Sequence, residues 1–380
     1  MTREVFADHR VYLDHNATSP LRPEGREAMM AALDCIGNPS SVHREGRAAR
    51  AIVEGAREQV AGMFSVKPGA VYFTSGGTEA ANWMLRPSTC DTKLIISHVE
   101  HPCVLSGHGF APGSVDAIPV TDDGIIDLDA LEAALSPGAI VAIQAANNET
   151  GVIQPLAEIA RLAGSKDVFL VCDAVQAAGR IPASDLAAAA AFFVSAHKFG
   201  GPKGAGAVVI NDDAFPLHPL IRGGGQEKRQ RAGTENVPAI AGLTAALEAA
   251  MLTQSELAGR TGQFRQKLEG GIRAIASDAI IFGEHARRLP NTTCFSIPGK
   301  SAETSLIAFD LAGIAVSSGS ACSSGKVERS HVLNAMRAPQ AISMGAIRVS
   351  LGWTTTEADI DRILSVLSKI CSGRQDRYAA

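Results

Sequence analysis

Three absences narrow the classes of protein that this sequence can encode. No run of apolar residues reaches the roughly 18–20 residues that a membrane-spanning helix needs. Residues 1–14 are charged and lack the apolar core of a secretory signal peptide, so we expect no secretory leader there. Lysine and arginine are scattered without a basic stripe and the formal net charge is -4, so we expect no nucleic-acid partner.

Cysteine is also scarce, with seven residues that lie far apart in a chain of 380. An odd number at such spacing argues against a disulfide framework and predicts a reducing, cytoplasmic location. Hydrophobic residues make up 46% of the chain and charged residues 19%, which is typical of a globular protein with a large core. The length allows two domains.

Between about residues 70 and 210, short β-rich apolar runs alternate with helix-like stretches. The expected strands are 71–74, 94–97, 115–119, 140–144, 168–172, 192–195 and 205–210. The helical candidates between them are 78–85, 128–135 and 156–162. This alternation predicts an α/β fold in which helices cover both faces of a mostly parallel sheet.

The rest of the chain predicts a smaller α+β domain. We expect an interrupted helical stretch over 237–276, strands over 292–297, 315–318 and 346–350, and a closing helix over 357–371. The predicted organisation is therefore a large domain over 15–250 and a small domain over 251–380, with an N-terminal segment over 1–14 that packs with the small domain.

The segment TSGGTE (74–79) follows a predicted strand and opens a predicted helix. In α/β proteins, ligands bind at the carboxyl ends of strands. The glycines let the backbone approach an anion, while the helix N-terminus and the Thr78 hydroxyl supply hydrogen-bond donors. An ordinary capped Gly-rich turn has the same pattern, so this segment alone leaves both interpretations open.

Two further strand ends carry charged residues. Asp173 closes an apolar strand in VCDAVQ (171–176), where a buried carboxylate needs a cationic or donor partner, although a plain helix N-cap would also explain it. Lys198, in SAHKFGGPKG (195–204), follows an apolar strand and is a candidate Schiff-base nucleophile. The alternative for Lys198 is a surface lysine in a turn.

Taken together, these segments resemble the aminotransferase-like, fold-type I pyridoxal-phosphate enzymes, in which a phosphate cradle, a strand-end Asp and a Ser-x-His-Lys segment follow in this order. The resemblance is closest to cysteine desulfurases of the class V aminotransferase group, the kind that feeds iron–sulfur cluster assembly. Its motifs are LDHNAT (13–18), GNPSS (37–41), EH (100–101), NNETG (147–151), GGGQE (223–227), SSGSACSS (317–324), SHVL (330–333) and IRVSLG (347–352).

The resemblance implies pyridoxal 5'-phosphate as the cofactor, bound covalently by Lys198, whose amine must be neutral to react. It implies that Asp173 keeps the pyridine nitrogen protonated, which makes the ring a stronger electron sink. Gln176 and Asn148 would contact the ring's phenolic oxygen or orient the substrate. The implied phosphate ligands are Gly77, Thr78, Ser195 and His197, with Thr234 from the other subunit of a homodimer.

The resemblance also implies roles for two residues that act on the substrate, L-cysteine. His101 would stack on the ring and transfer protons, for which an unperturbed pKa near 6.5 is suitable. Arg348 would clamp the substrate carboxylate through a planar, bidentate fork.

Cys322 is the residue that separates desulfuration from transamination. Its serine and glycine neighbours cannot pack a core and predict a mobile loop, whereas a buried structural cysteine would need apolar neighbours. By resemblance, its thiolate takes sulfur from L-cysteine as a persulfide and L-alanine is released. A sulfur acceptor or iron–sulfur scaffold protein is then the implied partner.

Two alternatives remain open from the residues. A metal-binding protein could use His98, His101 and Cys103, although zinc sites usually have four ligands. A transaminase or a selenocysteine lyase could share the fold. A transaminase would have no need of Cys322, and a selenocysteine lyase would strongly prefer selenocysteine over cysteine.

Overall fold

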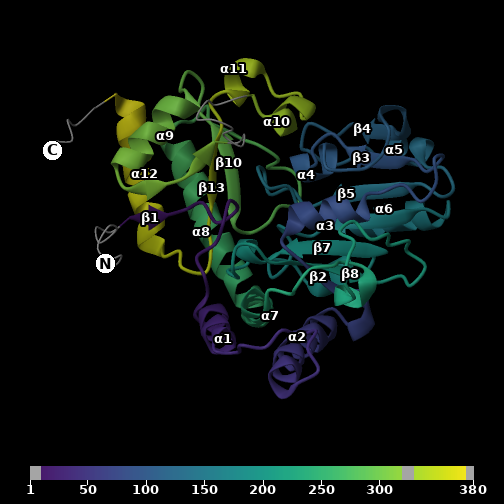
Figure 1. Cartoon of the computed structure of the whole chain (residues 1–380). Coiled ribbons are helices and arrows are strands. Elements are labelled where there is room, and N and C mark those ends of the chain that lie inside the picture. The colour runs from purple at the N-terminus through teal and green to yellow at the C-terminus, as the bar shows by residue number, and fades with distance from the viewer. Residues whose placement is uncertain (1–9, 319–328, 374–380) are drawn as a thin grey trace.

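The architecture centres on a seven-stranded sheet in the computed structural model, which describes residues 10–318 and 329–373 (Figure 1). The strand order is β2-β8-β7-β6-β5-β3-β4. The strands are β2 (Val71–Thr74), β3 (Leu94–Ser97), β4 (Val115–Ile118), β5 (Ile140–Gln144), β6 (Phe169–Asp173), β7 (Ala191–Ser195) and β8 (Gly206–Ile210). Only β8 runs antiparallel to its neighbours. The predicted α/β fold with a mostly parallel sheet is confirmed, and each predicted strand of this sheet is within one residue at either end.

Helices cover both faces of this sheet, so its strands are apolar on both sides. Alternate residues point to opposite faces: Val141 and Ile143 join one apolar cluster, whereas Ile140 and Ala142 join the other. The first cluster also contains residues of α5, α6 and α7, and the second contains residues of α3 and α4. These helices are α3 (Gly77–Met84), α4 (Pro102–Leu105), α5 (Leu128–Ala134), α6 (Leu156–Gly164) and α7 (Val237–Leu252).

Two N-terminal helices, α1 (Pro23–Leu33) and α2 (Arg44–Met63), were not assigned from the sequence. In α2 the buried residues Ala49, Val53, Ala56 and Val60 recur at helical spacing and pack into the first cluster. Helix α1 packs closely on α7. The approach is so close that a Cβ atom added to Gly25 would lie 3.0 Å from the carbonyl oxygen of Gly242.

A second, antiparallel sheet has the order β12-β13-β10-β9 and lies beside the large sheet (Figure 1). Its strands are β9 (Ile280–Ile281), β10 (Thr292–Ser296), β12 (Ser317–Ser318) and β13 (Ile347–Ser350). The accompanying helices are α8 (Gln254–Ile275), α9 (Ala302–Leu311), α10 (His331–Ala335), α11 (Gln340–Ser343) and α12 (Glu357–Ser372). The predicted stretch 237–276 is thus divided between α7 and α8, and the predicted strand 315–318 is split in two.

The N-terminal strand β1 (Val11–Tyr12) pairs in parallel with β11 (Ile314–Ala315), so the start of the described chain lies against this second sheet region. Within the described ranges, no single helix has the length and apolar composition needed to cross a membrane. Helices α7 and α8 meet those criteria only when taken together, across a bend of 67°.

Candidate active site

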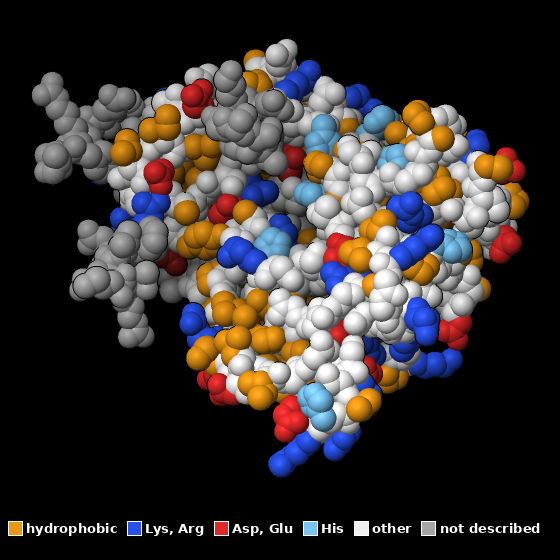
Figure 2. Space-filling model, viewed as in Figure 1, with side chains coloured by type: hydrophobic (Ala, Val, Ile, Leu, Met, Phe, Trp, Pro, Cys, Tyr) orange, Lys and Arg blue, Asp and Glu red, His pale blue; other side chains and the backbone are white. Residues whose placement is uncertain are grey.

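Six strands of the large sheet present their carboxyl ends at one edge, because every strand from β2 to β7 points the same way. The chain following these strands carries the residues that the sequence analysis selected: Gly77, Thr78, His101, Asn148, Asp173, Gln176, Ser195, His197 and Lys198. Figure 2 shows basic, acidic and histidine side chains gathered along a hollow between the large-sheet and small-sheet regions.

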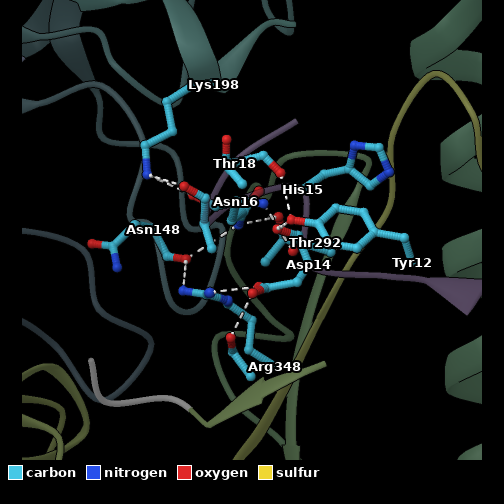
Figure 3. Close-up of polar contacts among 12 residues, drawn as sticks. Tyr12, Asp14, His15, Asn16, Thr18, Asn148, Lys198, Thr292 and Arg348 are labelled. Atoms are coloured by element: carbon cyan, nitrogen blue, oxygen red, sulfur yellow. Dashed lines mark hydrogen bonds and ion pairs between the residues drawn. The ribbon is translucent and has the colours of Figure 1, made fainter. Parts of the chain in front are cut away.

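Lys198 lies in a short turn that follows β7, and its amine points toward the LDHNAT segment (Figure 3). The Lys198 Nζ donates hydrogen bonds to the carbonyl oxygens of Asn16 at 2.8 Å and Ala17 at 3.0 Å. Burial and the positive charges of Arg348 and Arg180 together lower the pKa of Lys198 to about 8. A substantial neutral fraction, which a nucleophilic amine requires, is therefore present near neutral pH.

The reaction of Lys198 with an aldehyde should speed up as the pH rises through about 8, because only the neutral amine attacks a carbonyl. The measurement is the initial rate at which pyridoxal phosphate becomes borohydride-stable on cofactor-free protein across a pH series. Lys198→Ala serves as the blank. A midpoint near the ordinary lysine value of about 10.4 would contradict the perturbed pKa.

Asp173 is the last residue of β6 and is buried. Its Oδ1 accepts a hydrogen bond from the Val175 N–H at 2.9 Å within a turn, and no helix starts there, so the N-cap interpretation is not supported. Burial raises the pKa of Asp173 to about 6, although the Val175 N–H and the charge of Lys198 act in the opposite direction. A cationic N–H partner would stabilise the ionised carboxylate, as a protonated pyridine nitrogen does.

The turn after β2 contains two glycines that let its backbone approach neighbouring segments closely. Gly76 has a φ of 152°, a conformation that side chains disfavour, and a Cβ atom added to Gly77 would lie 2.9 Å from the Val175 Cγ2. The Gly76 position also faces Ser195 Oγ, and the buried Nδ1 of His197 has no hydrogen-bond partner within residues 10–318 and 329–373. Hydroxyl, backbone and imidazole groups of this kind fit a phosphate group, which is rich in acceptor oxygens.

Thr234 lies elsewhere in this single chain. It is exposed and lines a separate cavity with Phe73, Thr74 and Ser75. The chain's own fold therefore leaves Thr234 outside the cluster around Lys198.

His101 differs from the sequence expectation in its pKa. Burial, together with the positive charge of Lys198, lowers the pKa of His101 to about 4 rather than leaving it near 6.5. Its Nδ1 accepts a hydrogen bond from the Cys103 N–H at 3.1 Å and so begins α4. The imidazole is therefore neutral at physiological pH.

Sequence reasoning missed two residues that organise the base of the site, Asn16 and Arg180. The carbonyl oxygen of Asn16 accepts hydrogen bonds from both Lys198 and Gln176, the latter at 2.9 Å. Arg180 donates to the Asn16 Oδ1 at 2.8 Å and to the Lys198 carbonyl oxygen at 3.0 Å, and it also contacts Gln176 Oε1. The position of Asn16 within the LDHNAT motif could have predicted its role. For Arg180, the only indication in the sequence was its spacing of four residues from Gln176.

Arg348, from β13, closes the opposite side of the site and is 7% exposed (Figure 3). It donates to the Asp14 Oδ1 at 2.8 Å and to the Asn148 carbonyl oxygen at 3.1 Å. The buried Nε of Arg348 has no hydrogen-bond partner among the described residues. The side-chain amide of Asn148 likewise makes no hydrogen bond to any described residue.

Ser317, at the start of β12, donates to the Asp14 Oδ2 at 2.8 Å, which links the Arg348 contact to the chain that leads toward Cys322. Cys322 itself lies outside the described residues. The alternative of a metal site gains no support, because residues 10–318 and 329–373 contain no group of three or more His, Cys, Asp or Glu able to hold a metal ion.

Comparisons with known proteins agree with this arrangement. The family model described as aminotransferase class-V matches residues 11–363. The chain is 41% identical over 371 residues to the cysteine desulfurase IscS of Dictyoglomus turgidum, covering 95% of this chain and 94% of that protein. A cysteine desulfurase of Cereibacter sphaeroides is 42% identical over 378 residues, covering 95% of both chains. The structure of a NifS-like protein from Rickettsia africae matches with a TM-score of 0.88 at 35% identity, over 96% of this chain and 100% of that one.

Proposed function

The chain belongs to the class-V aminotransferase family and to its pyridoxal-phosphate-dependent cysteine desulfurases, and from this premise we propose which of its residues convert L-cysteine to L-alanine. The observation that carries the proposal is the position of Lys198, an amine of lowered pKa that interacts electrostatically with the buried Asp173 and the buried Arg348. A covalent anchor, a partner for the pyridine nitrogen and a carboxylate clamp would thus meet in one site.

The residues that would hold the cofactor divide into two groups. Lys198 would bond to its aldehyde carbon and Asp173 would pair with the ring nitrogen. Gly77, Thr78, Ser195 and His197 would receive the phosphate, and Gln176 and Asn148 would contact the ring's phenolic oxygen or orient the substrate. When bound, the cofactor withdraws electrons from the substrate's α-carbon, which weakens bonds next to it.

The chain's own groups would then bind the substrate and move protons. Arg348 would bind the carboxylate of L-cysteine through its guanidinium group, which Asp14 holds in orientation. The Lys198 amine, once released, can take the proton from the α-carbon because its pKa is near 8. His101 would take part in the proton transfers at the substrate thiol.

Sulfur transfer would be the task of Cys322. Its thiolate would attack the sulfur of the bound substrate, forming a sulfur–sulfur bond while the substrate's carbon–sulfur bond breaks. The electron pair of the broken bond would remain on carbon, which takes up a proton to become L-alanine. The persulfide on Cys322 could then pass its terminal sulfur to an acceptor thiol.

The direct test is product analysis with purified protein, L-cysteine and a thiol reductant. We expect L-alanine and sulfide in equal amounts, because each turnover breaks one carbon–sulfur bond. Pyruvate with ammonia, or a keto acid formed only when an amino acceptor is supplied, would instead indicate elimination or transamination. Comparing selenocysteine with cysteine in the same assay distinguishes a selenocysteine lyase.

We also propose a homodimer, supported by the exposed position of Thr234 away from Lys198 in its own chain. If Thr234 completes the phosphate site of a second chain, each active site needs two chains. Light scattering should give twice the mass of one chain for the active protein. A monomer with full activity would contradict this proposal.

The remaining proposals concern the setting of the reaction. A sulfur acceptor or iron–sulfur scaffold protein would receive the persulfide sulfur, consistent with the name IscS carried by a relative. A reducing, cytoplasmic location is supported by six cysteines that are free among the described residues. In this organisation residues 15–250 would bind the cofactor, and residues 251–380 would supply Arg348 and Cys322, with residues 1–14 packing on them.

A further inference from the structure

A largely buried ion pair joins the first turn of α3 to the loop that contains Arg231, which is distant in sequence. Arg231 donates from Nε to the Glu79 Oε1 at 2.8 Å and from Nη2 to the Glu79 Oε2 at 3.1 Å. The two side chains are 22% and 11% exposed, so the pair is largely shielded from water. This bidentate geometry is the stronger form of an arginine–carboxylate contact.

Glu79 also holds the turn that precedes its own helix. Its Oε2 accepts a hydrogen bond from the Ser75 N–H at 2.8 Å, just before Gly76 and Gly77. One carboxylate therefore binds both the arginine of the distant loop and the backbone of the turn assigned above to the cofactor phosphate. Replacing the Glu79 carboxylate should therefore remove a hydrogen bond that holds the backbone of this turn.

The loop that supplies Arg231 is itself firmly anchored. Three successive residues, Glu227, Lys228 and Arg229, have positive φ values of 44°, 57° and 68°, which non-glycine residues rarely adopt. Glu227 is buried and accepts hydrogen bonds from Arg57 at 2.7 and 2.8 Å and from the Phe73 N–H at 3.0 Å. This second buried pair compensates for the strained backbone and fixes the loop beside β2.

We propose that Glu79 and Arg231 are positioning residues for the phosphate-binding turn 75–77, and that Arg231 also neutralises a carboxylate that would otherwise repel the phosphate. This inference rests on the proposed function for the identity of the phosphate group. Glu79 lies in the first turn of the helix whose N-terminus faces that site, so its unpaired charge would act against a dianion at short range. The Arg231 guanidinium removes this repulsion and keeps the carboxylate on the Ser75 N–H.

The test compares two ligands that differ only in the phosphate. Cofactor-free full-length protein is titrated with pyridoxal phosphate and with pyridoxal, followed by absorbance, for wild type, Arg231→Met, Glu79→Gln and the double variant. We expect Arg231→Met to weaken pyridoxal phosphate binding by about tenfold or more, with pyridoxal binding unchanged within about twofold. The double variant should bind pyridoxal phosphate no more weakly than Arg231→Met, because the repelling charge is then gone.

Lys67→Met is the matched control, since Lys67 forms an exposed ion pair with Asp213 on the same part of the molecule. It should leave both affinities unchanged. Equal weakening of both ligands would show a general structural role and overturn the proposal, as would unchanged binding of both. If Arg231→Met fails to fold, Arg231→Gln makes the same comparison, because it also removes the charge. Failure of the proposed function would appear separately, as a wild type that forms no L-alanine from L-cysteine.

Discussion

Replacing Lys198 with alanine should abolish covalent binding of pyridoxal phosphate and reduce sulfide release from L-cysteine on the order of 1,000-fold or more. The expected size of the effect follows from the two tasks assigned to one amine, the covalent anchor and the acceptor of the α-carbon proton. Both tasks need a neutral amine, and burial beside Arg348 and Arg180 provides one by lowering the Lys198 pKa to about 8.

The measurement is borohydride reduction followed by peptide mapping. In the wild type the cofactor tag should be found on the peptide containing Lys198, and in Lys198→Ala no peptide should carry it. Lys203→Ala is the matched control, because Lys203 lies in the same glycine-rich segment but is exposed. A tag on Lys203 or Lys166 in the wild type would refute the assignment.

Cys322→Ser should separate cofactor chemistry from sulfur transfer. The variant should keep its visible absorbance and still change its spectrum when L-cysteine is added, because the proposed cofactor and carboxylate contacts are Lys198, Asp173 and Arg348. Sulfide release should fall by about a hundredfold or more, since a serine hydroxyl is a poor nucleophile toward sulfur at neutral pH.

Mass spectrometry after turnover should find one added sulfur on the wild-type peptide that contains Cys322. Cys90→Ser provides the matched control, because Cys90 is a free, exposed thiol in the large-sheet region. It should desulfurate cysteine at the wild-type rate. Near wild-type desulfuration by Cys322→Ser would show that the proposed sulfur acceptor is wrong.

The strands that carry the site could be predicted because fully buried parallel strands leave a simple signal. The run 140–143 is apolar throughout and leads into Gln144, so the position of the strand and of the polar residues after it can be predicted. Helix α2 left a weaker signal because its narrow stripe of alanine and valine alternates with arginine and glutamate.

The parts of the site that could not be predicted depend on contacts between residues far apart in the chain. Asp14 meets Arg348, and Arg180 reaches Asn16, only through tertiary structure. The lowered pKa of His101 could not be predicted for a related reason: the value near 6.5 belongs to an imidazole in water, whereas burial and the charge of Lys198 lower it here.

The pairing between the two ends of the described chain has a consequence for biosynthesis. Val11 pairs with Ile314, the backbone N–H of Asn16 bonds to Ser350 Oγ at 2.9 Å, and Asp14 binds Arg348. A ribosome-bound chain can build the strands up to β8 early, but the LDHNAT segment lacks these partners until nearly the whole chain has emerged. The cofactor should therefore bind stably only after release from the ribosome. Before that, a chaperone could bind the carboxyl edge of the large sheet, which the LDHNAT segment does not yet cover.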